Sequence, residues 1–443
     1  MCRTDESSFF FSVVTAAYNV EPWIGSFLQS LKAQSLDYKQ YIQLIVVDDG
    51  STDGTGTVAA NWTAEHPENT IYIRQKNEGA ASARNRGLHC AQGDWVTFCD
   101  ADDFVCDTYF DTVKTFLESG FDGLLAACNP IFFHEQTNSF SDTHPLRFKF
   151  RNGNIVVDLD QHPEYVQLFC NSAFFRREAL QNSGLRFDGR VRPSFEDGHL
   201  LNKFLLLAGS RKIAFLQDAL YFYRKRAQGD GLVDSGWARP EKYREQIVHG
   251  YLDLVRFAKQ KTDRVPPFIQ QAVIYDTQFY MDRFLLRTVP RPFSSQEFAD
   301  FLDIMRFLFA HIERDQVLFS PLPMLAMRSR IAMLKVFKGE RVPILPLIVS
   351  KIAAAQKELW ASACTAEKTR FHFQSGQETQ NPLKRKTIPY RFCGILLCVE
   401  HYFHLSLKDG LSLSCTVDGQ TVGFRHNGEF FNTFSVSNLS QGN

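Results

Sequence analysis

The sequence lacks an excess of either charge: its 443 residues include 49 Lys plus Arg and 49 Asp plus Glu. This balance argues against nucleic-acid binding and against a disordered acidic tail. The 10 cysteines include no C-x-x-C pair, so neither a zinc ribbon nor a disulfide framework is indicated. Scattered, unpaired thiols suit a reducing cytoplasm.

Long apolar segments are also absent. Met1 to Ser8 is polar, so we expect no signal peptide. The apolar stretch 342–355 contains Lys351 and two prolines and is too short to span a bilayer. Basic residues near this stretch leave peripheral attachment open. We therefore expect a cytoplasmic protein, either soluble or bound at the inner face of the cell membrane.

Strand and helix patterns alternate in the first part of the chain. Apolar runs at 9–19, 42–47, 70–74 and 95–99 predict strands, and the segments between them carry helical spacing. This alternation predicts an α/β fold with a mainly parallel sheet. Right-handed crossovers then place the carboxyl ends of the strands at one edge, which is where open α/β sheets bind ligands.

A D-x-D triplet follows the fourth of these strands. Asp100 and Asp102 flank Ala101, and alternate side chains of an extended strand project to the same side. Two neighbouring carboxylates repel each other unless a cation or a proton lies between them. Mg²⁺ and Mn²⁺ accept such oxygen ligands and leave room for phosphates. A solvated turn can show the same triplet, but its position at a strand end predicts a site for a metal-bound diphosphate.

Other residues are expected at the same edge. Tyr18 lies just past the first strand, where its ring could stack on a base. Asp48 or Asp49 could accept hydrogen bonds from a uracil imide or from ribose hydroxyls, although a plain strand-ending turn is the preferred explanation when this motif is taken without the others. Arg84 lies one turn into a helix, where it could bind phosphate oxygens or simply be solvated.

In order and content these motifs resemble the family 2 glycosyltransferases, which are inverting enzymes with a GT-A fold that use nucleotide-activated sugars. Four segments carry the resemblance: 13–19, 46–53, 77–85 and 100–103. The resemblance implies that Asp102 binds Mn²⁺ or Mg²⁺ directly, while Asp100 serves the ribose or the water shell of the metal. It also implies a bound nucleotide, UDP by family frequency, contacted by Ala16, Tyr18, Asp48, Asp49, Asn77, Arg84, Asp100 and Ala101.

The stretch 192–199 supplies a candidate base. A sugar hydroxyl is a poor nucleophile, so inversion needs a carboxylate within hydrogen-bond reach of it. By resemblance Asp197 is this base, and Glu196 orients the acceptor or is the second candidate. Taken alone, Asp197 would suit any helix N-terminus. His199 could bind the acceptor or the metal, although an isolated His is more often a packing residue.

A basic run at 221–226 precedes a loop at 227–231. By resemblance Arg224, Arg226 and Ser235 contact the diphosphate, and the loop closes over it and excludes water. A solvated basic strand end is the open alternative. If the run is a strand, Lys225 faces away from its neighbours.

We expect three regions: a GT-A domain at 9–236, a helical extension at 237–372, and a small β-rich C-terminal region at 383–443. A polar segment at 374–382 looks like a linker. Short strands are predicted at 390–399, 403–407, 411–416 and 421–426, with a turn at 426–428. This last region could bind polymer, form a homo-oligomer or begin another module.

The stretch 192–199 and the helical extension together resemble glycosyltransferases of bacterial teichoic acid and capsule assembly. The implied reaction moves a sugar from a nucleotide-sugar donor to a hydroxyl of a polysaccharide or polyol-phosphate acceptor. The position after the first strand lacks the G-x-G-x-x-G motif, which argues against a dinucleotide-dependent oxidoreductase. It also lacks a Gly-rich loop with basic residues, which argues against a nucleotidyltransferase. The alternative is a non-catalytic polysaccharide-binding or assembly module that retains the fold. The intact Asp100, Asp102 and Asp197 argue against it.

Overall fold

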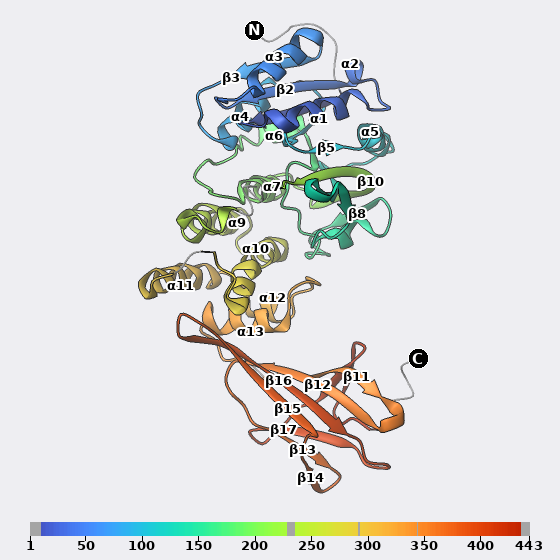
Figure 1. Ribbon diagram of the computed structural model, residues 1–443, viewed down its shortest axis with the longest axis vertical. Coiled ribbons are helices and arrows are strands. Elements are labelled where there is room, and N and C mark those ends of the chain that lie inside the picture. The colour runs from blue at the N-terminus through green and yellow to red at the C-terminus, as the bar shows by residue number, and fades with distance from the viewer. Residues whose placement is uncertain (1–9, 228–234, 291–292, 343, 436–443) are drawn as a thin grey trace. The chain divides into compact units, whose positions relative to one another are not determined.

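The computed structural model describes residues 10–227, 235–290, 293–342 and 344–435 (Figure 1). The chain divides into two compact units, Met1–Val273 and Ile274–Asn443. The division falls inside helix α10 (Pro267–Leu286) rather than at residue 236.

Among its described residues, unit 1 is built on a 10-stranded sheet with the main order β3-β2-β1-β4-β9-β6-β10-β5. The run β3-β2-β1-β4 is parallel, as predicted, and β6 and β10 form a further parallel pair. Strand β9 lies antiparallel to both β4 and β6, which joins the two halves of the sheet. The strands are β1 (Phe11–Ala17), β2 (Ile42–Asp48), β3 (Thr70–Arg74), β4 (Trp95–Thr97), β5 (Phe104–Val105), β6 (Leu125–His134), β7 (Ser139–Ser141), β8 (Ile155–Asp158), β9 (Ala173–Arg176) and β10 (Lys212–Lys225).

Helices cover this sheet, which is why strands β1 and β2 are apolar almost throughout and buried. Helix α4 lies against β1 at Gly87, where an added Cβ would approach a methyl group of Val14 to 2.3 Å. This close approach fixes α4, and with it Arg84, over the sheet. The α-helices of unit 1 are α1 (Glu21–Lys32), α2 (Tyr38–Tyr41), α3 (Thr55–Glu65), α4 (Ala80–Cys90), α5 (Tyr109–Glu118), α6 (Arg177–Asn182), α7 (Glu196–Leu207) and α9 (Asp253–Thr262).

Strand register places the predicted motifs at one edge. Ala17 pairs with Asp48, and Asp48 pairs with Arg74, so β1, β2 and β3 end side by side. Strand β10 pairs antiparallel with β5 through Phe222 and Phe104. This pairing carries the basic end of β10 back beside the D-x-D triplet.

Unit 2 begins with helices, as the periodicity predicts. They are the second half of α10, then α11 (Ser295–Phe309), α12 (Arg314–Leu318) and α13 (Met327–Val336). Helix α11 starts with a capping box in which Ser294 and Glu297 satisfy each other's backbone N–H groups. No helix among the described residues combines the length and apolarity needed to cross a membrane.

The β-rich part of unit 2 contains two sheets with the orders β15-β16-β12-β11-β19-β20 and β14-β13-β17-β18. Both sheets contribute to one apolar core, so this part is a small β-sandwich. Its strands are β11 (Leu347–Ala353), β12 (Glu358–Thr365), β13 (Phe371–Ser375), β14 (Glu378–Gln380), β15 (Lys384–Phe392), β16 (Ile395–Ser406), β17 (Leu413–Val417), β18 (Gln420–Thr421), β19 (Phe424–His426) and β20 (Glu429–Phe431).

Three expectations for this part are wrong. The predicted strand 390–399 straddles a hairpin, because Cys393 and Gly394 turn the chain with φ of 45° and 79°. The predicted linker 374–382 includes paired strand residues of β13 and β14, and β14 is a short polar strand at the edge of its sheet. The β structure starts at Leu347 rather than at 383. The predicted turn at 426–428 is confirmed: Asn427 and Gly428 both have positive φ, as a two-residue hairpin requires.

Candidate active site

Arg84 is the centre of the candidate site. Its Nη2 donates to Oδ1 of Asp100 at 2.9 Å, and its Nη1 donates to Glu196 at 3.0 Å and to Asp197 at 3.1 Å. Burial would lower the pKa of Arg84, but the carboxylates of Asp197, Asp100 and Glu196 raise it well above its ordinary value. The guanidinium therefore stays charged and joins the D-x-D triplet to the candidate base.

Asp197 is held on both oxygens. Oδ1 accepts from Arg84, and Oδ2 accepts from the backbone N–H of Cys170 at 3.0 Å. Burial raises the pKa of Asp197 to about 7, with the charges of Glu196 and Asp100 acting in the same direction and Arg84 opposing them. A carboxyl group with this pKa can exchange a proton near neutral pH, as a general base must.

Strained backbone sets the direction of this carboxylate. Phe195 precedes helix α7 with a φ of 83°, which is unfavourable for an aromatic residue. Its ring packs edge-on against Tyr251, with 4.6 Å between the centroids. A Cβ added at Gly198 would lie 2.9 Å from the same ring. Packing on these sides keeps Phe195 in place and so fixes where α7 begins, at Glu196.

The D-x-D carboxylates already have partners. Oδ2 of Asp100 accepts from Nδ2 of Asn171 at 3.0 Å, in addition to its bond from Arg84. Oδ2 of Asp102 accepts from Nε and Nη2 of Arg226, at 2.9 and 2.7 Å. Burial first, and the charge of Asp100 second, raise the pKa of Asp102, while Arg226 opposes the shift. The carboxylate pair thus attracts a cation, and Arg226 provides one.

Arg224 and Arg226 both contact Asp102 of the D-x-D segment. The sequence pattern does not predict these direct contacts. Nε of Arg224 donates to the carbonyl of Asp102 at 2.6 Å, and its backbone N–H donates to Asp103 at 2.7 Å. The guanidinium of Arg226 lies 4.1 Å from the ring of Trp23. Lys225 instead lies over Phe132 and Tyr223.

The predicted closing loop falls largely outside the described residues, since 228–234 are not described. Ser235 is half-buried, and its carbonyl accepts from the backbone N–H of Ala238 at 3.1 Å. Its predicted contact with a diphosphate stays a prediction.

The nucleotide-binding candidates divide into exposed and structural groups. Tyr18 is 49% exposed at the end of β1, and Asn77 is also exposed. Ala16 is half-buried, whereas Ala101 is buried. These positions are consistent with a ligand edge, and their contact with a nucleotide stays a prediction.

Asp48 and Asp49 both have intramolecular partners. Oδ1 of Asp48 accepts from the N–H of Ser51, and Oδ2 accepts from Tyr72. Asp49 accepts from Gln75 and from the N–H groups of Glu78 and Gly79, and so shapes the turn before α4. Asp49 therefore has a structural role that strand-ending position alone does not reveal.

His199 joins two helices. It is buried, and its Nε2 lies 2.7 Å from Asp253 at the start of α9. Lys203 pairs with the same carboxylate. Nδ1 has no hydrogen-bond partner among the described residues. These contacts support packing for His199, and its role toward acceptor or metal remains a prediction.

The sequence does not predict a role in the site for three residues that the structure places there: Trp23, Glu135 and Asn171. Glu135 accepts from the indole N–H of Trp23 at 2.6 Å and from the N–H of Ala227 at 3.0 Å. It therefore anchors the end of β10 to the start of α1. Each of these contacts joins distant parts of the chain, and no local motif marks them.

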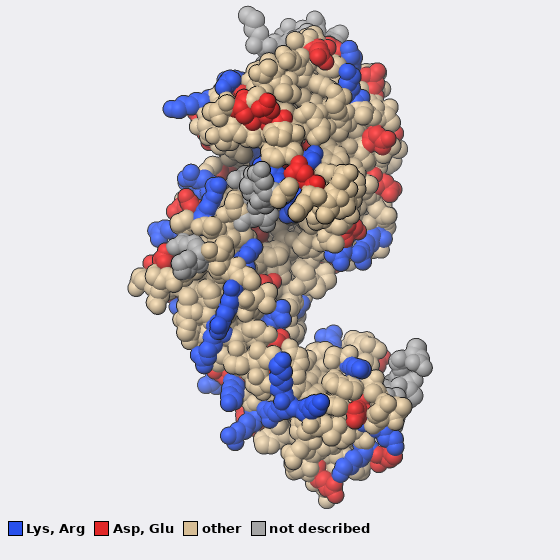
Figure 2. All heavy atoms as spheres, viewed as in Figure 1, with Lys and Arg blue, Asp and Glu red and all other residues tan. Residues whose placement is uncertain are grey.

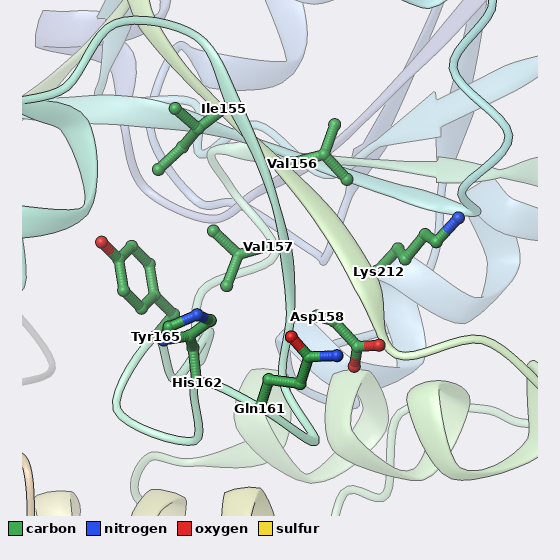
Figure 3. Close-up of a pocket in the computed structure, with 8 residues that line it drawn as sticks. All are labelled: Ile155, Val156, Val157, Asp158, Gln161, His162, Tyr165 and Lys212. Carbon is green, nitrogen blue, oxygen red and sulfur yellow. The ribbon is translucent and has the colours of Figure 1, made fainter.

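A separate cavity of about 430 Å³ lies elsewhere in unit 1. Figure 3 draws its lining residues, which come from β8, the segment after it and the first residue of β10. Lys212, at the first residue of β10, lies opposite Asp158 of β8 in the strand register. Arg224 lies near the other end of this 14-residue strand. None of the predicted site residues lines this cavity. Its lining residues are Ile155, Val156, Val157, Asp158, Gln161, His162, Tyr165 and Lys212.

Residues 12–184 match the family model described as Glycosyl transferase family 2. This part of the chain is a family 2 glycosyltransferase domain. The predicted family is thereby confirmed, and the site described above lies partly inside the match and partly just beyond it, at Glu196, Asp197 and Arg226.

Curated relatives carry related names. The Minor teichoic acid biosynthesis protein GgaB of Bacillus subtilis (strain 168) is 28% identical over 309 residues, which cover 70% of this chain and 33% of that protein. GgaA of the same organism is 25% identical over 312 residues, covering 69% of this chain and 68% of that protein. The chain thus spans about a third of the length of GgaB.

Solved structures support the fold. S. aureus TarS covers 95% of this chain with a TM-score of 0.60 and 15% identity, and 78% of TarS is matched. The complex of TarS 1–349 with UDP-GlcNAc has a TM-score of 0.57 and 18% identity, with 75% of this chain and 93% of that chain covered. The predicted GT-A fold, followed by helical and β-rich regions, is confirmed.

Proposed function

We propose that the chain is a metal-dependent inverting glycosyltransferase that moves a sugar from a UDP-sugar to a hydroxyl of a teichoic acid or capsule-type polymer. One observation carries the proposal: Arg84 brings Asp100 of the D-x-D motif and the candidate base Asp197 onto one guanidinium. The family of the domain and the names of its relatives support the reaction class and the acceptor class.

The donor would bind at the carboxyl edge of the parallel strands. The exposed ring of Tyr18 offers a stacking surface for a base. Arg226 and Arg224 supply positive charge at the end of β10, beside the D-x-D segment. The choice of uracil rests on family frequency and on the solved complex of TarS with UDP-GlcNAc. A cytoplasmic location follows from where nucleotide-sugars are made.

The residues present fit a divalent cation. Burial and the charge of Asp100 raise the pKa of Asp102, so a cation bound beside this carboxylate would stabilise its ionised form. Asp102 would hold Mn²⁺ or Mg²⁺, with Asp100 beside it. Such an ion stabilises the charge that develops on a diphosphate leaving group. Arg226 donates two hydrogen bonds to Oδ2 of Asp102. When an ion binds, Arg226 must therefore share this carboxylate with the ion or release it.

Asp197 would act as the base. As the acceptor hydroxyl oxygen forms its bond to the anomeric carbon, the bond to the nucleoside diphosphate breaks and Asp197 takes the hydroxyl proton. Arg84 and the N–H of Cys170 hold the carboxylate in position during this step. An oxocarbenium-like transition state is expected, as in glycoside hydrolysis.

The test is transfer of labelled sugar from a panel of UDP-sugars to a polyol-phosphate polymer by the full chain with Mn²⁺. We expect one preferred donor and a product whose anomeric configuration, read by NMR, is opposite to that of the donor. Retention of configuration would contradict the proposed role of Asp197. No transfer from any donor would favour the non-catalytic polymer-binding alternative.

A further inference from the structure

A second pocket, in the β-sandwich of unit 2, carries unbalanced positive charge. It encloses about 550 Å³, a volume suited to a small ligand or to one unit of a polymer. Three of its six lining residues are cationic and none is acidic. The six are Lys368, Thr369, Arg370, Arg385, Thr387 and His401.

The cations are available for a ligand. Lys368 and Arg370 are exposed, and neither forms an ion pair with a carboxylate among the described residues. The adjacent acid, Glu367, is paired with Lys335 at 2.6 Å. The positive charge of Lys368 and Arg370 is therefore not neutralised within the described structure.

The rest of the pocket is organised around Arg385. Its Nη2 donates to the carbonyl of Thr369 at 3.3 Å, and its guanidinium lies 5.5 Å from the ring of Phe403. These contacts tie the edge strand β15 to the turn before β13. His401, which also lines the pocket, is buried, with Nε2 3.0 Å from the hydroxyl of Thr365. A fixed Arg and two exposed cations form a donor set suited to phosphate oxygens.

We propose that this pocket binds a phosphodiester group of a polyol-phosphate polymer, the acceptor class named under the proposed function, on which this choice of polymer rests. The chain as a whole has equal numbers of basic and acidic residues, so the pocket is a local feature rather than part of a generally basic surface. Figure 2 shows Lys and Arg side chains gathered on part of the β-rich region. Binding here would hold the polymer to the chain and raise its effective concentration.

Other polyanions fit less well. Single-stranded nucleic acid is usually held by aromatic rings on which bases stack, and the lining residues include no Phe, Tyr or Trp. Peripheral membrane binding by a surface helix relies on an apolar face, and no Leu, Ile or Phe lines this pocket. Lysines on an edge strand also discourage edge-to-edge pairing, which explains Lys384 and Lys386 on β15 but not the turn residues Lys368 and Arg370.

The experiment measures binding of a poly(glycerol phosphate) of defined length to the full chain by calorimetry. The double variant K368A/R370A removes two exposed cations and should lower affinity about tenfold or more. The charge-matched control K384A/K386A changes residues that do not line the pocket and should bind nearly as wild type. Equal affinity of wild type and K368A/R370A would overturn the proposal.

Binding measurements with other phosphate-containing ligands identify which class of ligand the pocket prefers. Oligo(dT) of matched charge and phosphatidylglycerol vesicles should bind more weakly than the polymer, and inorganic phosphate should compete only at high concentration. Tighter binding of oligo(dT) or of vesicles, lost in K368A/R370A, would overturn the polymer assignment in favour of nucleic acid or membrane.

Donor turnover separates this inference from the proposed function. With an active chain, K368A/R370A should raise the KM for polymer and leave kcat and the donor KM unchanged. An inactive wild type whose polymer binding still depends on Lys368 and Arg370 would contradict the enzyme function and not the pocket. An active enzyme whose polymer KM is unchanged in the variant would contradict the pocket alone.

Discussion

Arg84 donates a hydrogen bond to Asp197 over 3.1 Å, although the two residues lie 113 positions apart in the sequence. The same guanidinium also holds Asp100 and Glu196. One buried cation therefore sets the spacing between the metal-binding candidate segment and the candidate base before any substrate binds. Such preorganisation is what a transfer reaction between two bound substrates requires.

Replacing Asp197 by Asn should abolish most of the transfer activity while leaving the donor bound. Loss of a general base typically lowers kcat by about 100-fold or more. The measurement is kcat for sugar transfer together with the Kd for UDP. Glu196→Gln is the matched comparison and should cost less. If Glu196→Gln inactivates the enzyme and Asp197→Asn does not, the roles of the two carboxylates are reversed.

The pH dependence of transfer should report the pKa of Asp197, which burial raises to about 7. A base acts in its ionised form, so kcat/KM should rise with pH and level off above about 7. Because the charge of Glu196 contributes to the raised pKa, Glu196→Gln should move the inflection to lower pH. A profile that is flat between about pH 5.5 and 8 would show that Asp197 is not the titrating base.

Replacing Arg84 by Met should destabilise unit 1 by about 3–5 kcal/mol, because it leaves three carboxylates without their shared cation. Arg84 opposes the rise in the pKa of Asp197, so without Arg84 this pKa rises further, and the lost stability should be largest at high pH and shrink as the pH falls and Asp197 becomes protonated. Urea unfolding at about pH 5 and pH 8 measures this. Arg86→Met changes an exposed residue of the same helix and should have little effect. An Arg84→Met loss that does not vary with pH would contradict the charge argument.

Arg226 should compete with a divalent cation for Asp102. Arg226→Ala removes the guanidinium that donates to Oδ2 of Asp102, so Mn²⁺ should bind more tightly in the absence of donor. Calorimetric titration with Mn²⁺ measures this. Lys225→Ala is the control, because it removes the same charge from a side chain that lies over Phe132 and Tyr223. Unchanged or weaker Mn²⁺ binding by Arg226→Ala would mean that this ion pair does not compete.

The first half of unit 1 could be predicted closely because its strands are continuous apolar runs bounded by turn residues. The strand at Thr70–Arg74 and the parallel order around β1 follow from this pattern. The D-x-D segment and the Glu196–Asp197 pair could be placed near one another from motif order. Their connection through Arg84 could not, because it depends on side-chain contacts between distant segments.

Other features of the structure could not be predicted for similar physical reasons. The hairpin at Cys393 and Gly394 interrupts an otherwise alternating stretch, and only the positive φ of both residues reveals it. Asn171 and Glu135 stand in no recognisable motif, and each joins the site through a contact made in three dimensions. Asp49 holds the turn before α4, and its predicted contact with a nucleotide stays a prediction.

The most direct test of the central claim is nucleotide release from a panel of UDP-sugars by the full chain. Release should require Mn²⁺ or Mg²⁺, stop on addition of chelator, and fall to background in Asp102→Ala, with one donor clearly preferred. Metal-independent release that is unchanged in Asp102→Ala would contradict the assignment of Asp102 and with it the account of the site.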